Sequence, residues 1–299
     1  MAPYWSDHWG NPSSRQHRQG LTAAAAVALA RRQIAETLGV DSDRLIFTSG
    51  ATEANNLALL GHARAQGCGH LISVTTEHHA VLDPLAQLQR EGFQVSLLKP
   101  QPDGLIKPSQ LAAAITPETR LVSVMAANNE IGVLQPLKEL AAICRDREIV
   151  LHSDAAQAFG HIPLEPDNLG LDLVSLSAHK LYGPKGIGAL LIREGVRLQP
   201  LQWGGGQEAD LRAGTLPTPL IVGFAAAVHE AMADRDVRHT RLAALRAQLW
   251  KRRHDQLPPL ARHGAAAPRL SHNSNIPLPG TPGTPPHLIL RSHLALRPR

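Results

Sequence analysis

The chain has 299 residues, of which 43% are hydrophobic and 18% are charged, and its formal net charge is +5 at pH 7. This composition predicts a folded globular protein and excludes intrinsic disorder over most of the chain. Aromatic residues make up 3% of the sequence and the arginines are scattered, so no stacking platform beside a basic stripe is predicted. We therefore expect no nucleic-acid partner.

Helix and strand patterns alternate along most of the chain. An alanine-rich amphipathic helix is predicted over 18–38 and ends at Gly39. Beyond it we expect strands at 45–47, 71–74, 94–98, 121–125, 149–152, 173–176 and 189–192, and helices at 52–65, 81–91, 108–115 and 137–147. Strands too apolar to alternate, joined by helices, indicate the α/β class with a mostly parallel sheet flanked by helices.

The last third of the chain has a different pattern. A long helical tract rich in Ala, Leu and Arg is predicted from Leu220 to about Leu257, and a proline-rich tail follows. The tail contains only fragments of regular pattern, such as 288–290. We divide the chain into a large domain, residues 1–234, and a partial, truncated small domain, residues 235–299.

Two cysteines, Cys68 and Cys144, provide neither a disulfide framework nor metal-ligand spacing, so we expect a reducing compartment and no metal site. We expect both to be small buried hydrophobic side chains, as free cysteines usually are. The apolar run 22–30 is too short to span a bilayer, and no secretory pattern opens the chain. A cytoplasmic protein without membrane association is predicted.

The stretch 171–188 joins an apolar strand to Ser177, His179 and Lys180 and then to a glycine-rich turn. A lysine at the end of a buried strand is costly unless its charge is neutralised or its amine is used. A Schiff base with a carbonyl cofactor such as pyridoxal phosphate would use it. Such a cofactor also needs a partner for its pyridinium nitrogen and a cradle for its phosphate.

Ligands of parallel sheets bind beyond the carboxyl ends of the strands, so the residues that follow each predicted strand are the candidates for a binding site. After the first strand, Gly50 permits close backbone approach, and Ala51 and Thr52 open a helix whose free N–H groups favour an anion. Taken alone, an ordinary Ser/Thr helix cap is the commoner structure for such a stretch.

Three other strand ends carry groups that suit a pyridine ring. Asp154 is either a surface turn residue or the partner of a pyridinium N–H. Gln157 and Asn129 are candidate donors to a ring oxygen. The imidazole of His78 could stack on a planar cofactor and carry protons near neutral pH, although a lone strand-end histidine is more often structural.

Six segments, in one order, resemble the class V aminotransferase-like, pyridoxal-phosphate-dependent cysteine desulfurases. They are residues 48–56, 76–81, 128–132, 152–157, 177–186 and the split segment 204–208 with 211–216. The resemblance extends from about Pro3 to the low 290s. It implies the fold-type I architecture, a homodimer, and conversion of L-cysteine to L-alanine with transfer of sulfur to an acceptor protein, as in iron–sulfur cluster assembly.

The resemblance also implies a role for each candidate residue. Lys180 would be the Schiff-base lysine, His78 the stacked imidazole and Asp154 the pyridinium partner, with Gln157 and Asn129 beside the ring. The phosphate would be held by Ala51, Thr52, Ser177 and His179, and Thr215 would reach the phosphate of the neighbouring subunit.

The sequence also departs from the family. It begins after the segment that usually contributes to the substrate pocket, and Ala209 and Asp210 stand where Arg and Gly are usual. It ends about where the loop with the persulfide-forming cysteine is expected, and neither Cys68 nor Cys144 matches that position. We therefore expect pyridoxal phosphate binding with weak or absent desulfuration.

Three functions stay open from the sequence. The first is an impaired cysteine desulfurase. The second is another class V pyridoxal phosphate lyase or aminotransferase that acts on a related amino acid. The third is a catalytically silent remnant or dimer partner.

Overall fold

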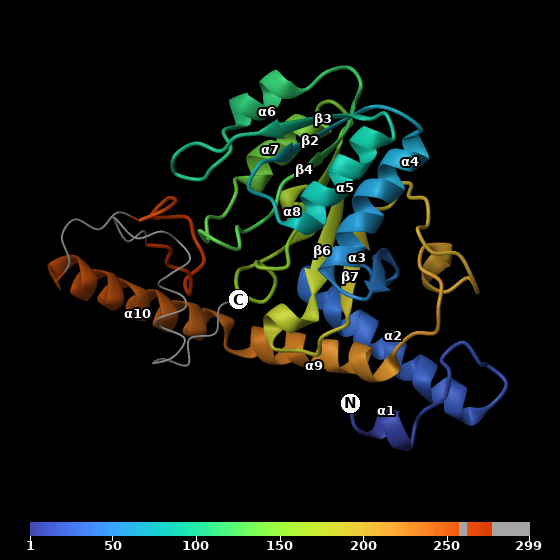
Figure 1. Cartoon of the computed structure of the whole chain (residues 1–299). Coiled ribbons are helices and arrows are strands. Elements are labelled where there is room, and N and C mark those ends of the chain that lie inside the picture. The colour runs from blue at the N-terminus through green and yellow to red at the C-terminus, as the bar shows by residue number, and fades with distance from the viewer. Residues whose placement is uncertain (257–261, 277–299) are drawn as a thin grey trace.

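Residues 1–256 and 262–276 are described by the structure, a computed structural model of the chain (Figure 1). Seven strands form one sheet in the order β1-β7-β6-β5-β4-β2-β3. They are β1 (Leu45–Thr48), β2 (His70–Val74), β3 (Gln94–Leu98), β4 (Thr119–Ser123), β5 (Val150–Asp154), β6 (Leu173–Ser177) and β7 (Gly188–Ile192). The predicted α/β class is confirmed.

The direction of the strands decides where a ligand can bind. From β6 to β3 all neighbours pair in parallel, whereas β7 is antiparallel to both β6 and β1. Within this sheet β7 therefore runs against the other six strands. The carboxyl ends of those six strands lie at one edge, and it is there that the polar strand-end residues are expected to meet.

Helices cover both faces of the sheet (Figure 1). They are α1 (Pro3–Ser6), α2 (Arg18–Leu38), α3 (Ala51–Asn56), α4 (His62–Gln66), α5 (His79–Arg90), α6 (Pro108–Ala114), α7 (Leu137–Arg145), α8 (Pro166–Leu169), α9 (Thr218–Ala233) and α10 (Arg235–Gln256). A π-helical segment, η2 (Leu57–Gly61), joins α3 to α4, so the predicted helix over 52–65 is one continuous helical run.

Two apolar cores lie on opposite faces of the sheet. One packs α2, α7 and α9 against strand residues such as Phe47 and Val122. The other packs α3, η2 and α5 against Ile46 and Leu121, the chain neighbours of those two residues. Because successive side chains of a strand point to opposite faces, inner strands that are buried on both sides are mostly apolar, and their few buried polar side chains need hydrogen-bond partners. This explains the apolar strand patterns of the sequence.

The predicted single helical tract from Leu220 to Leu257 is wrong, because two helices stand there. α9 ends at Ala233 and α10 begins at Arg235. Asp234 lies between them with non-helical backbone angles, and its carbonyl accepts the first N–H bond of α10, from Arg238. Aspartate is favoured at helix starts, which is why the chain turns there. None of the residues of α10 is buried.

The segment 262–276 lies beside α10 (Figure 1). Arg246 of α10 donates to the Leu270 carbonyl, and the Arg262 guanidinium lies 4.1 Å from the centroid of the Trp250 ring. The expected fragment at 288–290 falls outside the described residues. Among the helices that the structure describes, none combines the length and the apolar composition needed to cross a membrane.

Candidate active site

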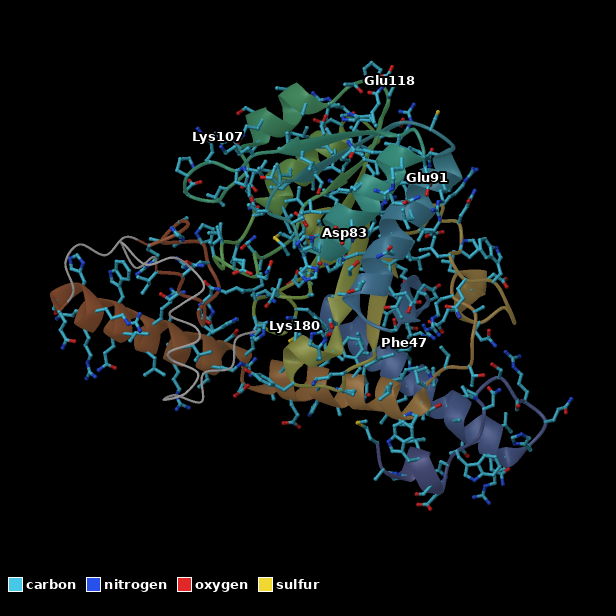
Figure 2. The ribbon with its side chains drawn as sticks, viewed as in Figure 1. Phe47, Asp83, Glu91, Lys107, Glu118 and Lys180 are labelled. Carbon is cyan, nitrogen blue, oxygen red and sulfur yellow. The ribbon has the colours of Figure 1, made fainter. Side chains whose placement is uncertain are left out.

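A cavity of about 1470 Å³ opens at the carboxyl edge of the sheet. Nine of the ten predicted site residues line it: Ala51, Thr52, His78, Asn129, Asp154, Gln157, Ser177, His179 and Lys180. They come from the ends of β1, β2, β4, β5 and β6, so the parallel sheet brings together residues that are up to 129 positions apart, from Ala51 to Lys180. Figure 2 shows Lys180 and Glu118 towards opposite ends of the sheet.

Lys180 lies in a 3-10 turn, η3 (Ala178–Leu181), that directly follows β6. The turn ends at Tyr182, whose φ of 63° is in the left-handed region, and the chain then returns through β7. The lysine side chain is half-buried and lines the cavity, while its backbone carbonyl lies 3.3 Å from His161 Nε2. A short turn between paired strands therefore presents the amine to the cavity.

Asp154 is the last residue of β5 and is 7% exposed. Its Oδ1 accepts the N–H of Ala156 at 2.9 Å, and its Oδ2 accepts from Asn55 Nδ2 at 2.7 Å. Burial raises the pKa of this carboxyl group, and the two donors together with the charges of His78 and Lys180 oppose that rise. A buried carboxylate held in this way is suited to a cationic N–H in the cavity.

The start of α3 forms a polar concavity beside β6 and β7. Gly50, at φ 149°, precedes Ala51, and no side chain caps the helix start. A Cβ atom on Gly188 of β7 would lie 2.4 Å from the Leu176 carbonyl oxygen and 2.7 Å from the backbone of Gly50. Only glycine therefore permits this close approach of the strand to the turn. Exposed N–H groups at a helix start attract anions such as phosphate.

Two further residues complete the concavity. Ser177 Oγ and His179 Nδ1 lie 2.8 Å apart at the end of β6. Both side chains line the cavity together with Ala51 and Thr52. A hydroxyl group, an imidazole and backbone N–H groups are all possible donors to a phosphate oxygen.

His78 caps the start of α5. Its Nδ1 accepts the Ala80 N–H at 3.0 Å, which places the ring proton of the neutral imidazole on Nε2. The side chain is exposed at the cavity. The neighbouring His79 also lines the cavity, but its side chain is 84% exposed. Its Nδ1 lies 3.4 Å from Asp83 Oδ1.

The remaining three predicted residues differ in their surroundings. Gln157 is half-buried in the cavity wall. Asn129 also lines the cavity, and its Nδ2 donates to Glu130 Oε1 at 3.1 Å. Thr215 is exposed and lies outside the cavity lining, so the predicted reach towards a neighbouring subunit stays a prediction.

Neither cysteine lies in the cavity. Cys144 of α7 is buried, and burial raises the pKa of its thiol to about 12. The expectation that Cys68 is buried is wrong, because it is exposed between Gly67 and Gly69, directly before β2. Gly67 and Gly69 both have positive φ, so this segment is a tight turn between α4 and β2, and such connections usually lie on the surface. Within residues 1–256 and 262–276, no cluster of His, Cys, Asp and Glu side chains could hold a metal ion.

Sequence reasoning missed two buried polar residues of the cavity wall, Asn55 and Glu77. Both lie inside segments that resemble the family, but neither was given a role. A stretch from the C-terminal part, represented by Leu270, His272 and Asn273, also lines the cavity. Residues 269–275 also resemble the family, but they do not follow a predicted strand, so the sequence analysis gave them no role at the site.

Comparisons with known proteins identify the family of the chain. The aminotransferase class-V family profile matches residues 1–278. The cysteine desulfurase of Homo sapiens is 47% identical over 268 residues, which is 88% of this chain and 59% of that protein. The cysteine desulfurase IscS of Rickettsia akari (strain Hartford) is 46% identical over 289 residues, which is 95% of this chain and 70% of that protein.

A solved structure of a NifS-like protein matches with a TM-score of 0.94 at 33% sequence identity, covering 98% of this chain and 80% of that chain. The fold agrees with that of this solved structure, and the sequence aligns with both relatives over most of its length. The chain belongs to the aminotransferase class-V family, in which the relatives it matches are cysteine desulfurases.

Proposed function

We propose that the chain binds pyridoxal phosphate in this cavity and uses it on L-cysteine, as the cofactor-binding part of a cysteine desulfurase. The chain spans 59% of the length of the human cysteine desulfurase, so the activity, substrate and partners of such a protein are proposals for this chain. The observation that carries the proposal is that the Lys180 amine and the buried Asp154 carboxylate line one cavity.

The cavity residues fit the cofactor in three respects. The Asp154 carboxylate, held by two N–H donors and 7% exposed, would pair with the cationic ring nitrogen. The uncapped start of α3, with Ser177 and His179, would hold the phosphate. The Lys180 amine would hold the carbonyl carbon covalently.

The chemistry divides between the cofactor and the chain. When bound, pyridoxal phosphate supplies an electron sink for charge that develops at the substrate Cα. Lys180 Nζ would become a free amine once the substrate amine replaces it on the cofactor, and it would then take the Cα proton and return it. His78 would lie against the ring and hold a proton at Nε2. Asp154 would keep the ring nitrogen protonated.

Transfer of sulfur needs a thiolate nucleophile in the cavity. Cys68 lies at the far edge of the sheet and Cys144 is buried with a raised pKa, so neither can serve. We propose that these 299 residues alone bind pyridoxal phosphate and release little or no sulfide. The same observation favours a second candidate, a lyase or aminotransferase of this family, because such chemistry requires no cysteine.

Several finer statements belong to this proposal. They are a homodimer in which Thr215 reaches the phosphate of the neighbouring subunit, a sulfur-acceptor protein as partner, a cytoplasmic location, and a division into domains at residue 234. The names of the relatives support the desulfurase class alone.

The test is a spectral titration of the purified chain with pyridoxal phosphate. We expect a visible absorption band that saturates at one equivalent per chain, persists in Lys138→Ala, an exposed control on α7, and is lost in Lys180→Ala. Products from L-cysteine then separate the two candidates: sulfide with alanine indicates desulfuration, and a keto acid indicates transamination. The absence of any band in the wild type would reject the proposal.

A further inference from the structure

A second buried carboxyl group lies in the wall that contains Asp154. Glu77 follows β2, is 6% exposed and lines the same cavity. Its Oε1 accepts the Met125 N–H at 2.7 Å. Its Oε2 is buried and has no hydrogen-bond partner among the described residues. A carboxylate anion with one buried and unpaired oxygen is strongly disfavoured, whereas a carboxylic acid there is neutral.

The two carboxyl groups differ in how many donors hold them. Asp154 accepts two N–H bonds, from Asn55 at 2.7 Å and from Ala156 at 2.9 Å, whereas Glu77 accepts one. Hydrogen bonds from N–H donors stabilise the charged form of a carboxyl group. Glu77 accepts the N–H of Met125 and the Asp154 backbone carbonyl accepts the N–H of the next residue, Ala126, so the two residues are held by adjacent positions of one segment. Two buried carboxylates near each other repel, so a pair of this kind retains one proton. The donor count places that proton on Glu77.

The charges around the pair act in the same direction. Burial raises the pKa of Glu77 well above its ordinary value, and the charge of Asp154 adds to this rise. For Asp154, burial raises the pKa too, but its two donors and the charges of His78 and Lys180 lower it. The titratable groups that act on Asp154 are therefore His78 and Lys180, and the one that acts on Glu77 is Asp154. The side chains of Met125 and Asn55 are uncharged.

We propose that Glu77 carries the single proton of this acid pair and thereby keeps Asp154 as the carboxylate that faces the cofactor. The part that concerns the cofactor rests on the proposed function. Glu77 is then a positioning residue that acts through Asp154. A proton on Oε2 also makes this oxygen a donor, and Oδ1 of Asn55, buried in the same wall without a partner among the described residues, is an acceptor.

The test is infrared spectroscopy of the full chain during a pH titration. At pH 7 without pyridoxal phosphate, we expect a C=O band of a protonated carboxyl group in the wild type and in Glu118→Gln, a matched exposed control. The band should be missing in Glu77→Gln. In Asp154→Asn it should disappear at a lower pH than in the wild type, because the neighbouring negative charge is gone. If Glu77 only accepted the Met125 N–H and did not share a proton with Asp154, the band would disappear at the same pH in Asp154→Asn and in the wild type.

Equilibrium unfolding gives a second measurement. The folded-state pKa of Glu77 is raised above its unfolded value, so its favourable contribution is complete below that unfolded value and is lost as the pH rises towards the folded-state pKa. In that range the unfolding constant of the wild type should rise about tenfold per pH unit relative to Glu77→Gln. A ratio that stays constant with pH would overturn the proposal.

Adding pyridoxal phosphate separates this inference from the proposed function. A Glu77 band in a chain that gives no pyridoxal phosphate absorption supports the acid pair and contradicts the proposed function. Pyridoxal phosphate absorption in a chain without the Glu77 band contradicts the acid pair alone. If both hold, the band should disappear at a lower pH once pyridoxal phosphate is bound, because a cationic nitrogen beside Asp154 offsets the charge that acts on Glu77.

Discussion

Asp154 is the residue on which the proposed cofactor binding depends most. Its carboxylate is 7% exposed, so a cation that pairs with it is shielded from water and salt. Lys180 could be predicted from the sequence because a charged amine at the end of an apolar strand is costly to bury without a function. Asp154 could be predicted because the carboxyl ends of parallel strands lie at one edge of the sheet. Glu77 could not, since its importance lies in a missing hydrogen-bond partner, which only the folded structure reveals.

Replacing Asp154 by Asn keeps the shape of the side chain and removes its charge. We expect the affinity for pyridoxal phosphate to fall about 10-fold to 100-fold, because hydrogen bonds to charged groups contribute about 1.5–3 kcal/mol. Absorbance titration measures the change. Asp146→Asn, exposed at the end of α7, is the control and should bind as the wild type does. Equal affinities for all three proteins would show that Asp154 does not face the cofactor.

The two thiols should react very differently. Cys68 is exposed, whereas Cys144 is buried and burial raises its pKa to about 12. Because the thiolate is the reactive form, a thiol reagent at pH 8 should modify one cysteine per native chain, and Cys68→Ser should abolish that reaction. Both thiols should react after unfolding. Rapid modification of Cys144 in the native chain would contradict its placement in α7.

At the scale of elements, the sheet positions the site, and substitutions in its inner strands are expected to destabilise the fold. Inner strands are buried on both faces, and buried hydrogen bonds tie them together: His152 of β5 has its Nδ1 2.8 Å from Ser123 Oγ of β4 and its Nε2 3.0 Å from Ser175 Oγ of β6. The apolar patterns predicted these strands well. The break between α9 and α10 was missed because Ala-rich and Arg-rich sequence favours helix on both sides of Asp234.

His152 should make the stability of the sheet depend on pH. Burial lowers the pKa of His152 to about 3, from an ordinary value of 6.5. Since the folded-state pKa is the lower one, its favourable contribution is present above pH 6.5 and is lost as the pH falls towards 3. Relative to His152→Gln, the wild type should lose about 1.4 kcal/mol of unfolding free energy per pH unit in that range.

Denaturant unfolding between pH 7.5 and pH 5 measures this difference. His79→Gln, on the exposed start of α5, is the matched control, since its side chain is 84% exposed. A difference between the wild type and His152→Gln that does not change with pH would contradict the buried neutral imidazole.

Gly188 packs against the turn before α3, where we propose that the cofactor phosphate binds. In Gly188→Ala the new Cβ would lie 2.4 Å from the Leu176 carbonyl oxygen and 2.7 Å from the Gly50 backbone, so β7 or the turn before α3 must move. We expect a loss of about 2 kcal/mol in unfolding free energy and weaker pyridoxal phosphate binding. Gly205→Ala is the control, because its Cβ would meet only the flexible Gln207 side chain. If Gly188→Ala bound pyridoxal phosphate with unchanged affinity, the turn before α3 would not hold the cofactor phosphate.

At the scale of the whole molecule, one cavity collects residues from the ends of five strands and from the C-terminal segment. The resemblance could group the strand-end residues at one site because they lie in continuous motifs, and the structure places them in the lining of one cavity. The second group, which includes Leu270 and Asn273, reaches the cavity through contacts with the loop after β4: the Leu270 N–H donates to the Gly132 carbonyl, and Asn273 Nδ2 donates to the Glu130 carbonyl at 3.1 Å. Such contacts between distant segments carry no local sequence pattern.

The central claim is that the Lys180 amine holds pyridoxal phosphate. Reduction with borohydride fixes the cofactor to the amine that holds it, and mass spectrometry of the digested chain locates the label. We predict one phosphopyridoxyl group per chain, on Lys180, although Lys185 lines the same cavity. A label on Lys185, or one spread over several lysines, would contradict the account.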